Sequence, residues 1–213
     1  MEFEKYMETK FPNLSLRPAL FYSWDIGIRF ELGTEWKREY CNGNSPYHKG
    51  VYHRAVTLFK ASHLEDEEIF IVANVNDYGD KKTFEHKIKV FYSYVKDKNV
   101  LYKLKHKVIP YIFPEDDEEG KYKTHRFILK CKTSDIKYVS LLKAICNQDL
   151  GIKPSIIHDV FFINIKRETI FHVYDDRGCD LLSNSTETIR DIYNKYTQWI
   201  LDYDRVEIDS VFK

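Results

Sequence analysis

The sequence predicts an α+β fold in which a mixed or antiparallel sheet is flanked by amphipathic helices. Residues 159–165 and 169–174 are rich in β-branched and aromatic side chains and are separated by a short polar segment, a pattern typical of a hairpin. The turn residues 175–178 and a short run at 179–182 follow, so the hairpin is expected to extend into a β-meander. Apolar residues then recur at helical spacing across 185–203, which predicts a long C-terminal helix.

The N-terminal part is expected to add a short helix and a strand. Residues 1–10 suit a helix that ends before Pro12, because the residue before a proline disfavours α geometry. Between residues 26 and 33, apolar side chains alternate with polar ones or glycine, which is the period of a half-buried strand. Arg29 and Glu31 then project from the face opposite the apolar side chains.

The middle of the chain predicts further elements of both kinds. Segment 84–95 fits a helical and a strand period equally, and the helix is preferred because the segment is long for a strand. The acidic run 115–119 is expected to be a solvated loop, since its consecutive carboxylates lack the alternate spacing of a calcium loop. The other expected elements are a loop at 36–47, a helix at 46–62, a buried strand at 69–73, a turn at 76–80, an extended segment at 100–113, a strand at 122–132 and a helix capped by Ser134 and Asp135.

Length and composition suggest one compact domain, 1–213, with a weaker possible division into 1–114 and 121–213. Basic and acidic residues number 33 each, so the overall charge gives no reason to expect nucleic acid or an anionic membrane. The four cysteines lie far apart, and neither a signal sequence nor an apolar stretch long enough to cross a bilayer is visible. A cytoplasmic protein with reduced thiols and no membrane contact is therefore expected.

The densest polar cluster is formed by His158, Asp159, His172, Asp175 and Asp176. Carboxylates and imidazoles that meet on a hairpin could hold a metal ion or act as acid and base, so a metal-dependent hydrolase is one hypothesis. Turn chemistry explains the Asp-Asp-Arg-Gly run equally well, and this structural interpretation is preferred. The candidate catalytic residues are His172, Asp175, Asp176 and Arg177.

A binding site could also form where the two ends of the chain meet. If the strand at 26–33 lies beside the 175–178 turn, the binding residues would be Arg29, Glu31, Asp176 and Arg177. His48 and His53 lack the spacing of a zinc-binding helix and are expected to be surface or cap residues. The common nucleotide-binding and hydrolase motifs are absent from the sequence, so no cofactor is expected.

The chain resembles an uncharacterised bacterial family, the domain of unknown function 3885. The resemblance spans most of the chain and implies a cytosolic protein of low-GC Gram-positive bacteria, but it implies no activity. The matching stretches are Phe161-Phe-Ile-Asn-Ile, Val173-Tyr-Asp-Asp-Arg-Gly-Cys-Asp180, Ile192-Tyr to Trp199-Ile-Leu-Asp-Tyr203, Phe21-Tyr to Ile28-Arg-Phe-Glu-Leu-Gly33 and His53-Arg-Ala55.

These observations favour a non-enzymatic cytoplasmic module that binds another protein. A comparison with the immunity proteins that inhibit secreted toxins is an analogy of protein class and not a consequence of the residues. The metal-dependent hydrolase is the first alternative. The second is a nucleic-acid-binding protein that uses the basic stretches 103–107 and 121–130, although a solvated edge strand is preferred for 103–107. The oligomeric state stays open.

Overall fold

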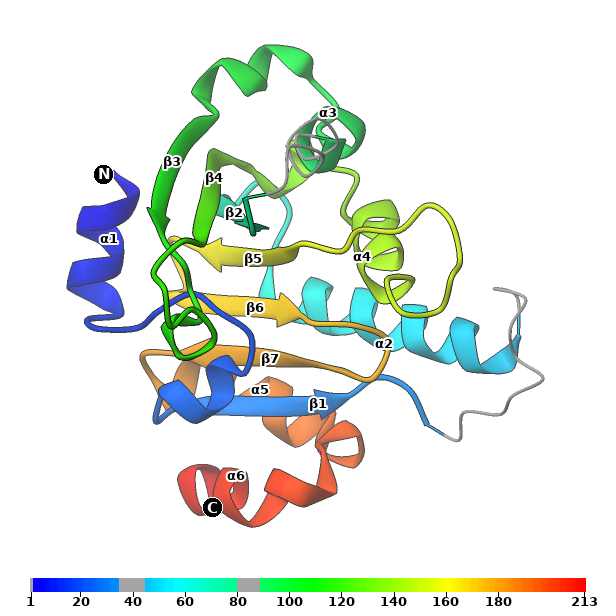
Figure 1. Cartoon of the computed structure of the whole chain (residues 1–213). Coiled ribbons are helices and arrows are strands. Elements are labelled where there is room, and N and C mark those ends of the chain that lie inside the picture. Colours follow the sequence, from blue (N-terminus) through cyan, green and yellow to red (C-terminus); the bar gives the residue numbers. More distant parts are fainter. Residues whose placement is uncertain (1, 35–44, 80–88) are drawn as a thin grey trace.

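The computed structural model describes residues 2–34, 45–79 and 89–213. Within them, seven strands form one antiparallel sheet in the order β1-β7-β6-β5-β2-β4-β3 (Figure 1). The strands are β1 (Gly27–Glu31), β2 (Glu68–Asp77), β3 (Lys105–Pro110), β4 (Lys123–Lys132), β5 (Asp159–Asn164), β6 (Thr169–Val173) and β7 (Gly178–Ser183). The helices are α1 (Phe3–Lys10), α2 (Pro46–Ser62), α3 (Lys89–Tyr94), α4 (Tyr138–Cys146), α5 (Thr186–Lys195) and α6 (Arg205–Phe212). The α+β prediction is confirmed, and the sheet is antiparallel.

Two hydrophobic cores lie on opposite faces of the sheet. On the larger side, Phe59 of α2 packs against Phe162 and Phe171, with ring centroids 5.1 Å and 5.8 Å apart, and α4 and α5 complete this layer. On the other side, Phe3 of α1 meets Phe70 edge to face at 5.4 Å. Helix α1 and the segment that follows it therefore cover the second face.

The predicted meander is present as β5, β6 and β7, and its register places one row of side chains across the strands. Arg29 pairs with Asp180, Asp180 with His172, and His172 with Phe161. Because alternate residues of a strand face opposite sides, this row points towards the face covered by α1, as Phe161 shows by its place in the smaller core. The row brings β1, near the start of the chain, beside the meander.

The helix α2 matches its predicted bounds. Ser45 is the N-cap, its hydroxyl accepts from the amide of His48 at 3.4 Å, and Pro46 occupies the first helical position. The strand predicted at 69–73 is longer and continues to Asp77, so the predicted turn begins later than 76. It can continue because the polar side chain of Asn74 is satisfied by the Leu16 carbonyl oxygen at 2.7 Å.

The helix predicted at 185–203 is interrupted. Helix α5 ends at Lys195, and two 3₁₀ turns, Thr197–Trp199 and Asp202–Asp204, lead to α6. The physical reason is the exposed edge of β1: Ile200 forms an antiparallel bridge with Phe30, and the Leu201 amide donates to the Arg29 carbonyl oxygen at 3.0 Å. Pairing with the sheet thus outweighs the local helical pattern.

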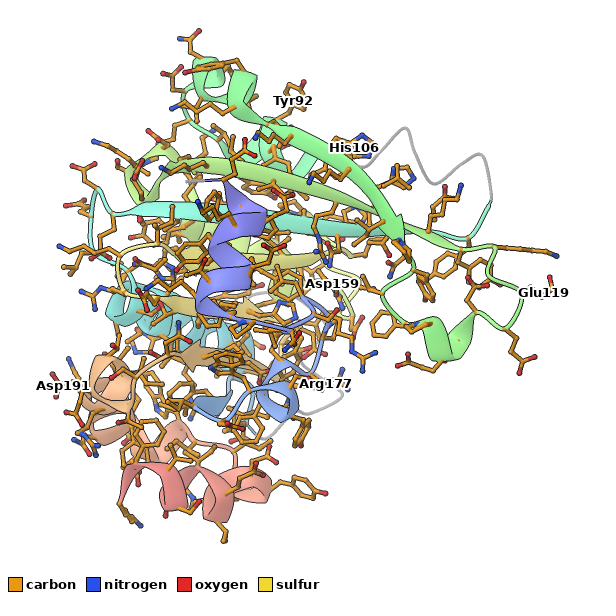
Figure 2. The ribbon with its side chains drawn as sticks, turned by 90° about the vertical axis from the view of Figure 1, so that its left-hand side faces the viewer. Tyr92, His106, Glu119, Asp159, Arg177 and Asp191 are labelled. Carbon is orange, nitrogen blue, oxygen red and sulfur yellow. The ribbon has the colours of Figure 1, made fainter. Side chains whose placement is uncertain are left out.

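Smaller differences concern the middle of the chain. Helix α3 confirms the helical interpretation of 84–95 where the structure describes it, whereas 80–88 and 35–44 lie outside the described residues. A 3₁₀ helix, Lys98–Lys103, precedes β3 in the segment expected to be extended. Ser134 and Asp135 form a 3₁₀ turn, so α4 begins only at Tyr138. Glu119 lies at the tip of a solvated loop, as predicted (Figure 2).

Among the described helices, none is long and apolar enough to cross a membrane.

Candidate functional site

Arg29 is held by a bidentate ion pair at one side of the sheet. Its Nε donates to Asp180 Oδ1 at 2.8 Å, and its Nη2 donates to Asp180 Oδ2 at 3.3 Å. Asp180 is fully buried and also accepts the amide of Phe21 at 3.2 Å. A paired guanidinium and carboxylate of this kind forms a strong, directional contact. The predicted binding residue Arg29 is therefore engaged inside the protein.

Aromatic rings surround the Arg29 guanidinium. The centroid of the Tyr22 ring lies 4.5 Å from Cζ, and those of Phe21 and Tyr174 lie 5.5 Å and 5.7 Å away. Burial opposes the charge of Arg29, but the hydrogen bonds and charge of Asp180 outweigh it, so the pKa of Arg29 is raised. The rings favour the same charged state through cation–π contacts.

Asp204 joins this cluster from the C-terminal end of the chain. The Tyr22 hydroxyl donates to Asp204 Oδ1 at 2.9 Å, and Asp204 Oδ2 lies 3.7 Å from Arg29 Nη1. Oδ2 is buried and has no hydrogen-bond partner among the residues that the structure describes. Residues from both ends of the sequence thus meet around one guanidinium. The residues predicted to join Arg29, namely Glu31, Asp176 and Arg177, are not members of this cluster.

Glu31 and the 175–178 turn lie next to this cluster but use other partners. Glu31 pairs with Gly178 through the backbone, and its carboxylate lies 3.9 Å from Arg54 Nη1. Asp175 is buried and folds back on the turn, where Oδ1 accepts the Arg177 amide at 2.7 Å and Oδ2 accepts Arg177 Nε at 2.8 Å. The Leu32 amide donates to the Arg177 carbonyl oxygen at 2.8 Å and fixes the turn against the end of β1. These contacts are those of an Asx-type turn.

Asp176 points to the other face of the sheet. It accepts a 2.5 Å hydrogen bond from the Tyr47 hydroxyl. Burial raises the pKa of Asp176, although the Tyr47 hydrogen bond works in the opposite direction. Nearby, His48 is fully buried, its Nδ1 lies 2.6 Å from Ser45 Oγ, and burial lowers its pKa. The sequence suggested a surface or cap role for His48; the surface role is wrong, because the ring is buried against Ser45, the N-cap of α2. No local pattern could place Tyr47 opposite Asp176.

The five residues of the metal-site hypothesis are not brought together. His172 is buried on the face covered by α1, stacked on Phe161 at 4.3 Å, with Nδ1 3.1 Å from the Val160 carbonyl oxygen. Asp159, whose pKa burial raises, belongs to the same face, whereas Asp175 and Asp176 are engaged as described above. Across residues 2–34, 45–79 and 89–213, no three His, Cys, Asp or Glu side chains are placed to hold a metal ion. The hydrolase hypothesis, including His158, therefore has no support in the geometry.

The basic stretch 103–107 contains the start of β3, which is the edge strand expected there. Lys105 pairs with Glu2 at 2.8 Å, and Lys107 pairs with Glu4. Helix α1 thus supplies carboxylates that neutralise two of the lysines. The nucleic-acid hypothesis, which needed several unpaired cations in a row, gains no support from this arrangement.

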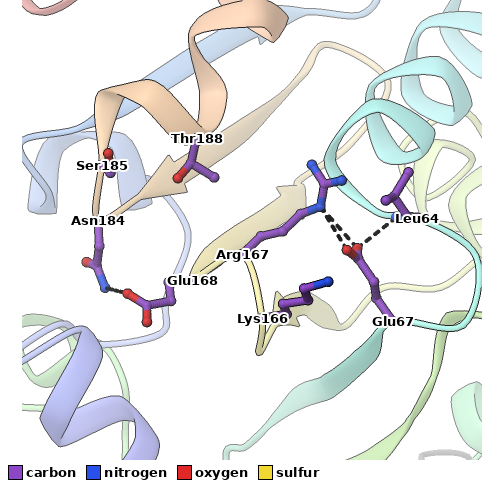
Figure 3. A pocket seen from close by; sticks show the side chains of 8 residues that line it. All are labelled: Leu64, Glu67, Lys166, Arg167, Glu168, Asn184, Ser185 and Thr188. Carbon is purple, nitrogen blue, oxygen red and sulfur yellow. Dashed lines mark hydrogen bonds and ion pairs between the residues drawn. The ribbon is translucent and has the colours of Figure 1, made fainter.

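A hollow of about 340 Å³ lies between the ends of α2 and β5 and the start of α5 (Figure 3). Three of its four charged side chains are paired, whereas Lys166 forms no ion pair with a described residue. Arg167 Nε donates to both carboxylate oxygens of Glu67 at 3.1 Å. Glu168 accepts from Asn184 Nδ2 at 3.3 Å and forms an ion pair with Lys10. The hollow is therefore explained by contacts that join the meander to α1 and α2.

His63, close to Glu67 and Arg167, should make stability depend on pH. Burial lowers the pKa of His63 to about 4, against an ordinary value of 6.5. Between about pH 6.5 and pH 4 the unfolded chain therefore binds a proton at His63 and the folded chain does not, so the free energy of unfolding decreases as the pH falls through this range.

Urea unfolding at about pH 7 and pH 5 should show that the free energy of unfolding is lower at pH 5 by roughly 2 kcal/mol because of this group. The His63→Phe variant should lose this part of the pH dependence. An equal decrease in the free energy of unfolding from about pH 7 to about pH 5 in the wild type and the variant would show that His63 is not responsible.

A protein family and a bacterial protein both match nearly the whole chain. Residues 3–204 match the family described as Domain of unknown function (DUF3885). The chain is 34% identical over 206 residues to "Uncharacterized protein YnaE" of Bacillus subtilis (strain 168), a match that covers 93% of this chain and 96% of that protein. No solved structure matches the chain. The match to the family extends from α1 to Asp204 and so includes the whole Arg29 cluster; the chain belongs to the DUF3885 family.

Proposed function

We propose that the protein is a cytoplasmic, non-enzymatic interaction module that binds another protein through the surface around Asp204. Three side chains define this Asp204 surface: Tyr22, Tyr203 and Val206. They are 54%, 86% and 85% exposed, although each is large and apolar or aromatic. Tyr22 hydrogen-bonds to the buried Asp204, and Tyr203 and Val206 lie within two residues of it in the chain. These exposed side chains next to one buried carboxylate carry the proposal, because grouped exposed apolar side chains mark interaction sites more than scattered ones do.

The Asp204 surface rests on a rigid base. Tyr22 is fixed by its hydrogen bond to Asp204 and by its contact with Arg29, which Asp180 holds in turn. A side chain that is already ordered loses little conformational entropy when a partner binds. Tyrosine also combines a large apolar ring with a hydroxyl, which suits it to the centre of protein interfaces.

The neighbouring sheet edge favours binding through side chains. Ile200 and Leu201 already occupy the outer edge of β1, so a partner cannot extend the sheet at these residues. The partner would instead contact Tyr203, in the turn before α6, and Val206, within α6. Helix α6 lies at the β1 end of the sheet (Figure 1). A secreted toxin, as in the immunity-protein analogy, is one class of protein that could occupy this surface.

Affinity capture with purified tagged protein tests the proposal. The wild-type chain should retain a stoichiometric partner from a lysate of the source cells, and the Tyr203→Ala/Val206→Ser variant should retain at least about tenfold less, as expected for interface hot spots. The matched control is Tyr92→Ala, which removes a 56% exposed tyrosine at the opposite end of the molecule from α6 (Figure 2). Equal melting temperatures would show that all three proteins are folded. Recovery of no stoichiometric partner, or equal recovery by the double variant, would contradict the proposal.

A further inference from the structure

A second surface feature lies near the β3 edge of the sheet, between the start of α1 and the residues that precede β3. It is a hollow of about 430 Å³, with Phe3, Phe70 and Ile128 as its floor. These three side chains belong to the smaller core and are only 6%, 3% and 3% exposed. The floor is therefore apolar and already ordered before any ligand arrives.

The rim of this hollow is basic. Lys103, Lys105 and Lys130 line it together with Glu2 and Tyr102. Lys105 pairs with Glu2 at 2.8 Å, and Lys130 pairs with Glu68 at 3.0 Å, but Lys103 forms no ion pair with any described residue. The ammonium groups thus exceed the carboxylates that neutralise them, and all of these ion pairs are solvent-exposed and weak.

Tyr102 adds an exposed aromatic ring to this rim. Its side chain is 82% exposed and lies in the 3₁₀ helix that leads into β3. The ring contacts the Lys103 ammonium, 5.6 Å from its centroid, and so presents an aromatic face next to a cation. A ligand that carries both an apolar group and negative charge would satisfy the floor, the ring and the lysines together.

The neighbouring strand indicates which ligand of this kind fits. Residues of β3 are mostly exposed, and within the described ranges no strand pairs with its outer edge. An extended peptide can lie along such an edge. Lys103, which forms no ion pair with a described residue, and the exposed, weakly paired Lys105 would favour acidic side chains in it over apolar ones.

We infer that this hollow is a docking site for an acidic peptide segment of a partner protein. One large apolar side chain of the segment packs on Phe3, Phe70 and Ile128, while its carboxylates face Lys103, Lys105 and Lys130. The site is independent of the Asp204 surface, because β1 and β3 are the two opposite edge strands of the sheet.

Synthetic peptides test this inference without knowledge of the natural partner. The probe is a fluorescein-labelled peptide in which one phenylalanine is flanked on both sides by aspartate and glutamate, and its binding is measured by fluorescence anisotropy. One matched peptide has lysines in place of the acidic residues, and another has alanine in place of the phenylalanine. A fluorescent long-chain fatty acid serves as the competing class of ligand. The protein variants are Lys103→Glu/Lys130→Glu and, with the same change in net charge at exposed positions of α2, Lys49→Glu/Lys60→Glu.

The acidic phenylalanine peptide should bind, and its affinity should fall by roughly tenfold or more with Lys103→Glu/Lys130→Glu and with the alanine peptide. The Lys49→Glu/Lys60→Glu control should bind like the wild type, and added salt should weaken the complex. Any one of four results would overturn the inference: no binding at low salt, equal binding of the lysine peptide, an equal effect of both double variants, or tighter binding of the fatty acid than of the peptide.

Discussion

Replacing Asp180 with alanine is expected to lower the free energy of unfolding by about 3–5 kcal/mol, because it leaves the Arg29 charge buried without its partner. Asp180 has no exposed surface, and it accepts two hydrogen bonds from Arg29 and one from the Phe21 amide. In a chain of this length the melting temperature should fall by about 10 °C. Urea unfolding followed by circular dichroism measures the effect.

A combined variant separates the unpaired charge from the loss of packing. Arg29→Met/Asp180→Leu/Asp204→Asn removes all three charges of the cluster, including the buried Asp204 carboxylate, and keeps side chains of similar size, so it should recover much of the stability lost in Asp180→Ala. A loss below about 1 kcal/mol in Asp180→Ala would contradict this account. It would mean that Asp204, whose Oδ2 lies 3.7 Å from Arg29 Nη1, can balance the charge alone.

Replacing Gly178 with alanine should be similarly harmful for a steric reason. A Cβ at this position would lie 2.7 Å from the Phe30 carbonyl oxygen and would collide with the Tyr174 hydroxyl. The carbonyl belongs to β1, which pairs directly with Gly178 through Glu31, so it cannot move without breaking the sheet. A loss of about 3 kcal/mol is expected, at the upper end of the usual range for overpacking.

Gly50 provides the matched control for the same substitution. It lies within α2, and a Cβ there would meet nothing within 4 Å. Alanine should therefore stabilise the helix by about 0.5–1 kcal/mol. Chemical denaturation of the two single variants should give changes of opposite sign. A Gly178→Ala protein as stable as the wild type would show that β1 and the 175–178 turn tolerate separation.

The sequence was most informative where local chemistry decides the structure. The alternation before Gly33 predicted β1, and two aromatic runs with a turn-forming segment predicted β5, β6 and β7. The bounds of α2 could be read from its periodicity. The Asp175 turn was also predictable, because an aspartate followed by a glycine favours such a turn.

Pairings between distant residues could not be read from the sequence. Arg29 was recognised as a candidate binding residue, but its partners Asp180 and Asp204 lie more than a hundred residues away, and only the strand register brings them together. The Tyr47 hydroxyl reaches Asp176 through the same tertiary arrangement. The continuous helix predicted at 185–203 failed for a related reason, since no local pattern reveals that Ile200 pairs with Phe30.

The closure of the β1 edge by Ile200 and Leu201 also has a consequence for the order of folding. During synthesis from the N-terminus, β1 emerges early, yet its strand partner β7 and the residues that cover its outer edge are among the last to appear. Contacts that span most of a chain form slowly, because a large loop must close first. A nascent chain therefore keeps Arg29 without its main partner until translation passes Asp180, and it keeps the outer edge of β1 open until Leu201 has appeared, so these partly folded chains expose a strand edge of the kind that chaperones cover.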